Sequence, residues 1–81
     1  MQLLSTQTEI AFQHWPPSRG IVVDAGTGSV TIETWNGSNW VLTDTYEVDI
    51  AVEYFTQNLT LRFTPIGDAV VSVDTDIGVK L

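Results

Sequence analysis

The sequence contains no cysteine among its 81 residues. This absence excludes both a disulfide framework and a metal site built from thiolates. A single domain of this length buries only roughly 60% of its extended surface when it folds. We therefore expect its stability to come from tight packing, from a partner, or from both.

Basic residues are scarce as well. Three lysine and arginine residues stand against ten aspartate and glutamate residues, which gives a net charge of −7. Nucleic-acid-binding proteins neutralise several phosphates with clustered cations, whereas Arg19, Arg62 and Lys80 lie far apart in the sequence. We expect no binding to nucleic acid.

Long hydrophobic runs are also absent. No apolar stretch approaches the ~20 residues that cross a bilayer, and the opening residues Met1–Leu4 lack the basic flank and length of a signal peptide. We expect neither membrane insertion nor export by a signal peptide.

Few residues offer catalytic chemistry. The single histidine, His14, precedes a bend at Trp15–Pro17, so a serine triad would have to rest on an unsuitable segment. Glu33, Asp49 and Glu53 fall on polar rows, where a solvated sheet face is the expected role. We predict no catalytic residue, no cofactor and no enzymatic activity.

A metal site is also not predicted, although one alternative stays open. Asp74 and Asp76 flank Thr75 near a strand end, and Asp44 and Asp68 are further acidic residues near predicted strand ends. Calcium binds six to eight oxygen ligands, but the EF-hand loop pattern is absent here. Acidic strand ends that keep the protein soluble are the simpler interpretation.

From Ser29 onward, apolar and polar residues alternate with a period of two, which is typical of half-buried antiparallel strands. Valine, isoleucine and threonine dominate, and no helical period is sustained. The predicted strands lie near residues 29–34, 38–44, 47–55, 58–64 and 68–74, with further strands at 9–12 and 21–23 and an extension over 77–81.

The predicted turns connect these strands as a meander. A three-residue loop, Trp35-Asn36-Gly37, with glycine in the left-handed conformation, would place Ile32 opposite Trp40. A similar loop ending at Gly67 would place Phe63 opposite Ala69. A bend around Thr56 and Gln57 would pair the two strands between these hairpins, with Tyr54 opposite Leu59 and Val52 opposite Leu61.

The predicted fold is all-β: a small antiparallel β-sandwich or flattened, jelly-roll-like barrel of about seven strands. The opening segment is rich in Gln, Thr and Ser. We therefore assign residues 1–18 to an N-terminal arm with one possible strand, and residues 19–81 to a single β domain.

Aromatic and polar residues near the first hairpin are the candidate contacts. Trp40 falls on the inward row and is assigned to the core. Trp35 is expected exposed at the hairpin tip, where it would act as an interface anchor with Asn36 and Asn39 as polar partners. Trp15 either closes the end of the barrel or contacts a neighbouring molecule.

Charge suggests two further features. Arg62 is expected to form a cross-strand ion pair with Asp49 or Glu53. Free strand edges in monomers are usually protected by lysine, proline or inward charges, yet the only lysine is Lys80. The edges are therefore predicted to be covered by another subunit.

The stretch Val30–Val41 (VTIETWNGSNWV), followed by alternating strands and Leu61–Thr64 (LRFT), resembles small β-sandwich domains among the virion proteins of tailed bacteriophages. In those domains an aromatic-Asx-Gly-Ser-x-Trp hairpin recurs. The resemblance covers about half of the chain.

The resemblance implies a non-enzymatic subunit for head decoration, for a head fibre or for the tail. Such a subunit would be a homo-oligomer, commonly a trimer, that docks on capsid or tail proteins in a virion assembled in the host cytoplasm. The alternative is a carbohydrate-binding or receptor-binding module that uses Trp35.

Overall fold

Eight antiparallel strands and no helix make up residues 1–75, the part of the chain that this computed structural model describes. The predicted strand extension over residues 77–81 lies outside that part. No helix that could cross a membrane occurs in these 75 residues. The strands are β1 (Gln2–Leu4), β2 (Thr8–Ala11), β3 (Ser18–Asp24), β4 (Ser29–Trp35), β5 (Trp40–Tyr46), β6 (Ile50–Phe55), β7 (Thr60–Ile66) and β8 (Val70–Val73).

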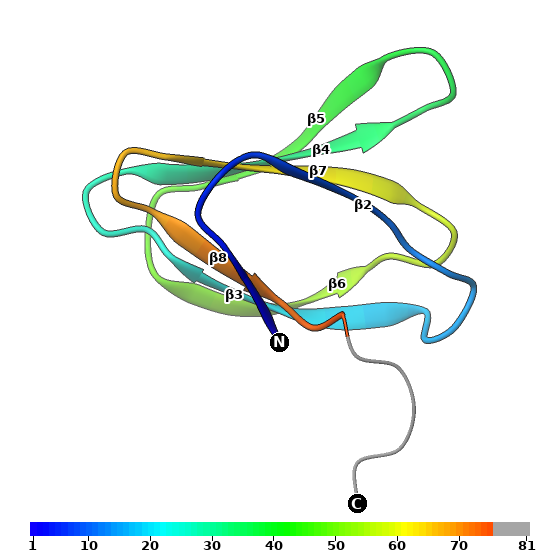
Figure 1. The fold of residues 1–81 in the computed structure, drawn as a ribbon, viewed down its shortest axis with the longest axis horizontal. Helices are drawn as coiled ribbons and strands as arrows, with labels where there is room; N and C mark the ends of the chain where they lie inside the picture. Colours follow the sequence, from blue (N-terminus) through cyan, green and yellow to red (C-terminus); the bar gives the residue numbers. More distant parts are fainter. Residues whose placement is uncertain (76–81) are drawn as a thin grey trace, which may run out of the picture.

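The strands form two four-stranded sheets, in the orders β1-β8-β3-β6 and β2-β7-β4-β5 (Figure 1). This interleaved order is that of a double-sheet jelly roll, in which every connection except the β4–β5 hairpin crosses between the sheets. The expected small, jelly-roll-like β-sandwich is therefore confirmed, with eight strands in the described residues.

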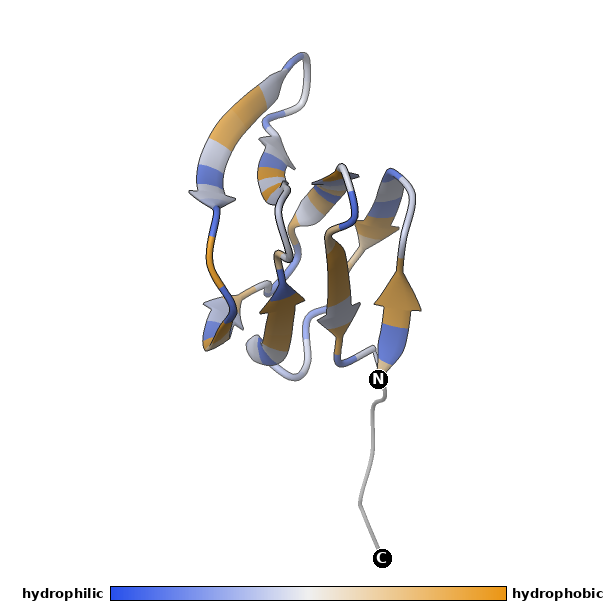
Figure 2. Ribbon diagram, turned by 90° about the vertical axis from the view of Figure 1, so that its left-hand side faces the viewer, coloured by the Kyte–Doolittle hydropathy of each residue, from blue (hydrophilic) through white to orange (hydrophobic). Residues whose placement is uncertain are grey.

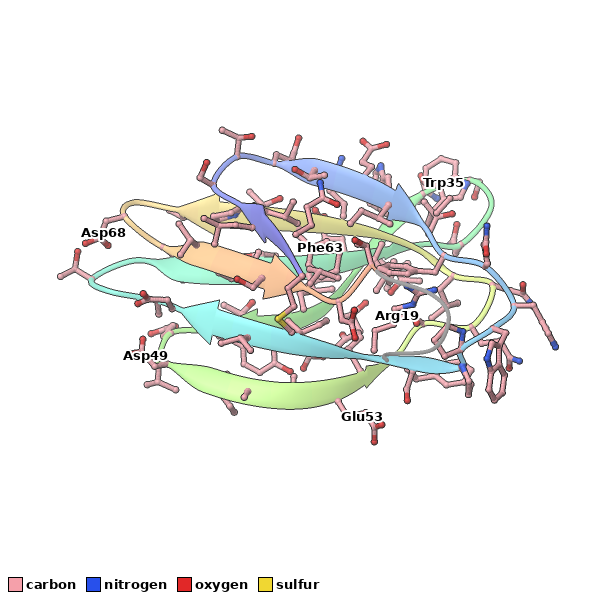
Figure 3. All side chains as sticks on the ribbon, turned by 60° about the horizontal axis from the view of Figure 1, so that its bottom comes forward. Arg19, Trp35, Asp49, Glu53, Phe63 and Asp68 are labelled. Atoms are coloured by element: carbon pink, nitrogen blue, oxygen red, sulfur yellow. The ribbon has the colours of Figure 1, made fainter. Side chains whose placement is uncertain are left out.

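The core lies between the sheets and follows from the alternating pattern of the strands. Apolar stretches run along strands of both sheets (Figure 2). Phe63 sits at the centre (Figure 3), and its ring meets that of Phe12 edge-on at a centroid distance of 6.5 Å. The buried apolar residues are Leu4, Phe12, Ile21, Val23, Ala25, Val30, Ile32, Leu61, Phe63, Ala69, Val71 and Val73.

The predicted meander is wrong in two of its three hairpins. Strand β6 pairs with β3, and β7 pairs with β2 and β4, so β6, β7 and β8 are not consecutive neighbours. Phe63 lies opposite Ile32 rather than Ala69, and Tyr54 lies opposite Arg19 rather than Leu59. The alternating pattern cannot separate these cases, because a strand that crosses to the facing sheet also buries its apolar row.

The opening residues, assigned to an arm with one possible strand, contribute one edge strand to each sheet. β1 pairs with β8, and β2 pairs with β7. Leu4 is buried, as is Phe12 directly after β2. β2 agrees with the strand predicted at residues 9–12, whereas β1 was not predicted, because a short edge strand needs only one or two buried apolar residues.

The remaining predicted hairpin, β4–β5, exists with a different register. Trp35 lies opposite Trp40, Glu33 opposite Leu42 and Ile32 opposite Asp44, which leaves Thr43 as the extra residue of a β-bulge. Ile32 is therefore in the core, while Trp40 lies on the outer face with Trp35. The expectations that Trp40 belongs to the core and that Ile32 faces it are both wrong.

Candidate binding surfaces

The turn that closes the β4–β5 hairpin is built around one asparagine. The Asn36 side-chain oxygen accepts hydrogen bonds from the backbone N–H groups of Ser38 (2.9 Å) and Asn39 (2.7 Å), and the Asn36 N–H donates to the Asn39 carbonyl (3.0 Å). Gly37 has a φ of 103°, which confirms the positive φ predicted there. The Asn36 side-chain oxygen is thus committed to the turn, and the role of Asn36 as a polar contact stays a prediction.

This turn brings two tryptophans together at the end of the hairpin. The ring centroids of Trp35 and Trp40 lie 5.3 Å apart with an interplanar angle of 58°. Trp35 is the last residue of β4 rather than part of the loop, and its side chain is 40% exposed. The two rings form a tilted pair on the outer face of the β2-β7-β4-β5 sheet.

Arg62 holds this pair in place. Its Nε donates to Glu33 Oε1 at 2.8 Å, and its guanidinium lies 4.4 Å from the centroid of Trp40. The Glu33 carboxylate raises the pKa of Arg62 above its ordinary value. The predicted partners Asp49 and Glu53 are wrong because they lie with β6 in the other sheet, where they accept hydrogen bonds from the Ala25 N–H and the Ser18 hydroxyl.

A hollow of about 380 Å³ opens beside these rings. It is lined by Glu9 from β2, Thr60 from β7, Trp35 from β4 and Trp40 from β5, so every strand of the sheet contributes one residue. We call these four residues the aromatic corner. The sequence did not indicate Glu9 and Thr60 as site residues, because only the crossover topology brings their strands beside the hairpin.

The other predicted contact residues lie elsewhere. Trp15, in the connection between β2 and β3, is 69% exposed, so it does not close the end of the sandwich, and its contact with a neighbour stays a prediction. Trp15 does not line the aromatic corner. Asn39 lies in the hairpin turn, and its side-chain amide is 3.4 Å from the Ser38 hydroxyl.

The acidic residues considered for calcium do not gather. Asp44 accepts a hydrogen bond from the Tyr54 hydroxyl, whereas Asp68 accepts from the Thr27 N–H and hydroxyl in a turn at the end of the sandwich opposite Trp35 (Figure 3). Within residues 1–75 no three acidic or histidine side chains are placed to hold a metal ion. Asp76 lies outside the described residues.

A second surface runs along the β6 edge of the sandwich. Of the four outermost strands, β1 and β2 have only three and four residues, and β5 carries the bulge at Thr43. Short strands and bulges both discourage a further strand from pairing. β6 is six residues long, and neither a register shift nor a proline interrupts it.

An apolar groove of about 500 Å³ lies beside this edge. Its lining includes Val52, Tyr54, Phe55, Tyr46 and Leu59. The Tyr54 hydroxyl donates to Asp44 at 2.5 Å, which connects β6 to the facing sheet, and burial together with the Asp44 carboxylate raises the Tyr54 pKa.

Comparisons of the chain with protein-family models, with curated proteins and with solved structures found no match.

Proposed function

We propose that this chain is a non-enzymatic structural subunit of a tailed-bacteriophage virion that oligomerises and docks on capsid or tail proteins. The virion setting rests on the resemblance of Val30–Val41 to phage β-sandwich domains. The jelly-roll strand order supports it by analogy, since viral capsid domains and lectins share that architecture.

The observation that carries the assembly role is the β6 edge. An edge strand presents a row of unpaired N–H and C=O groups to any strand of suitable length, and β6 is the one outermost strand in residues 1–75 that is both long and regular. The groove beside it offers places for side chains of an added strand. Backbone pairing would then supply affinity and the groove would supply specificity.

The sequence of β6 also selects a register for pairing with a second copy. Antiparallel pairing about Val52 places Ile50 opposite Tyr54 and Ala51 opposite Glu53 of the neighbour, and inward rows meet inward rows. Centring the pair on Glu53 would set two carboxylates directly opposite each other, which is destabilising. A trimer, which the resemblance implies, would instead set β6 against a different surface of the next copy, because a cyclic trimer has a head-to-tail interface.

Size-exclusion chromatography with light scattering tests the assembly role. At tens of micromolar we expect a dimer or a trimer, and a strictly monomeric mass would contradict the proposal. The exposed residue Ala51 then provides a matched pair of variants. In the two-fold arrangement Ala51→Glu faces Glu53 of the neighbour and weakens the dimer, whereas Ala51→Lys retains it.

The virion setting has its own test. Mass spectrometry of purified particles from a phage that encodes the chain should detect it in stoichiometric copies. Its absence from the particles would overturn the setting but leave the assembly through β6 intact.

A further inference from the structure

We propose that the aromatic corner binds a neutral saccharide, in a site separate from the β6 edge. The four residues that define the corner combine two aromatic faces, one carboxylate and one hydroxyl group around a hollow of about 380 Å³. That volume is within the range of small-ligand sites, which run from roughly 300 to 1,000 Å³.

The tryptophans supply the stacking surface. One face of a pyranose ring carries mainly C–H bonds, which pack against the electron-rich face of an indole. The guanidinium of Arg62 lies against the Trp40 ring, so Trp35, 40% exposed, offers the more open ring. Because the rings are tilted by 58°, a sugar on Trp35 also meets the wall formed by Trp40.

The corner is formed before any ligand arrives. Arg62 is fixed between Glu33 and Trp40, and the Asn36-centred turn sets the approach of the two strands that carry the tryptophans. A site whose side chains are already ordered loses less conformational entropy on binding. Arg62 is thus a positioning residue that acts through Trp40.

Polar groups at the rim match the hydroxyls of a sugar. The Glu9 carboxylate faces the charge of Arg62 but accepts no side-chain hydrogen bond within residues 1–75, so its oxygens are available to sugar hydroxyls. The Thr60 hydroxyl both donates and accepts. Together they fix the ring on the apolar platform.

The local charge selects against acidic sugars. Glu9 and Glu33 both flank Arg62, so two carboxylates face one guanidinium, and the whole chain carries a net charge of −7. A sialic or uronic acid would bring a further carboxylate into this field. A neutral sugar is not repelled by these carboxylates, so we assign neutral saccharides as the class of ligand.

A glycan array that presents neutral oligosaccharides beside their sialylated counterparts tests the proposal, with tryptophan fluorescence titration of each positive glycan. We expect binding to at least one neutral glycan and at least about tenfold weaker binding to its sialylated form. Trp35→Ala should weaken binding at least about tenfold, while the matched control Trp15→Ala leaves it unchanged.

Glu9→Gln provides a second variant, which should fold like the original chain because Glu9 is exposed. It should weaken binding of the neutral glycan by a few-fold. It should also reduce the difference in affinity between the neutral glycan and its sialylated form. Several results would overturn the proposal: no neutral glycan bound, equal binding of acidic glycans, or equal loss in Trp15→Ala. If no glycan binds and Trp35→Ala instead converts an oligomer to a monomer, the corner is a protein interface.

Discussion

Apolar and polar residues alternate in both halves of the β4–β5 hairpin, but the apolar residues are buried in only one of them. The hairpin base, residues 29–32 and 44–46, places Val30 and Ile32 in the core. The hairpin tip, residues 33–42, turns away from the facing sheet (Figure 1), and Val41, on the inward row opposite Thr34, is 47% exposed. Burial therefore depends on whether the facing sheet reaches a residue, and alternation alone does not decide it.

Truncating one apolar side chain in each half should give the largest difference. Ile32→Ala removes a fully buried side chain from the base, so we expect a loss of about 2–5 kcal/mol in the free energy of unfolding. Val41→Ala, on the same inward row in the tip, should change it by no more than about 0.5 kcal/mol. Chemical denaturation measures both, and equal losses would contradict the division of the hairpin.

Replacing glycine with alanine should affect stability differently in the hairpin turn and in a regular strand. Gly37 has a φ of 103° and open space around it, so Gly37→Ala costs backbone strain alone, about 1–3 kcal/mol. Gly20 lies within β3, where an added Cβ meets only the end of Met1 at 3.6 Å. Gly20→Ala should therefore be neutral or stabilising in the same thermal melts. Equal melting temperatures for the two variants would contradict the left-handed conformation at Gly37.

The Tyr54–Asp44 hydrogen bond holds the hairpin base to the facing sheet. Tyr54→Phe should lower the free energy of unfolding by about 1–2 kcal/mol, because it leaves the Asp44 carboxylate without this donor. Urea titration at neutral pH measures the loss. An unchanged midpoint would mean that this bond contributes nothing to the base.

The same residue predicts an alkaline response. The Tyr54 pKa is raised in the folded state, so the unfolded chain loses its proton first as pH rises. Its contribution to stability is full below the ordinary value of 10.0 and declines above it. Tyr54→Phe should flatten that decline, with a remainder from Tyr46, whose pKa is also raised.

The smallest expected effect comes from deleting Thr43. Because Thr43 is the extra residue of the bulge, its deletion leaves Glu33 opposite Leu42 and Ile32 opposite Asp44 in an uninterrupted ladder. We expect the chain to fold with a loss of no more than about 1 kcal/mol, chiefly through the hydroxyl contact with Thr34. Light scattering should show stronger self-association, since the β5 edge becomes regular. Failure to fold would contradict the bulge.

Local chemistry was enough to predict every strand except β1, and the positive φ of two glycines. The period-two pattern predicts the β segments from residue 29 onward, and the positive φ values at Gly37 and Gly67 follow from turn chemistry. Pairing was not predictable in the same way. A turn after β6 or β7 either folds back beside the strand or crosses to the facing sheet, and both bury the same apolar row.

The candidate site was predictable only in part. Trp35 was expected as an exposed contact because of its place near a glycine turn. Its partners were missed, since Trp40 reaches the outer face through a bulge that no residue type marks, and the sequence did not indicate where the predicted strand with Glu9 would pair. Arg62 was paired with carboxylates of the wrong sheet for the same topological reason.

Nuclear Overhauser effects across the β4–β5 hairpin test the bulged register, and with it the aromatic corner, most directly. We expect cross-strand contacts that link Glu33 with Leu42 and Trp35 with Trp40, together with contacts between Arg62 and the Trp40 ring. Contacts between Ile32 and Trp40 as a directly opposed pair would instead return Trp40 to the core face and remove the corner.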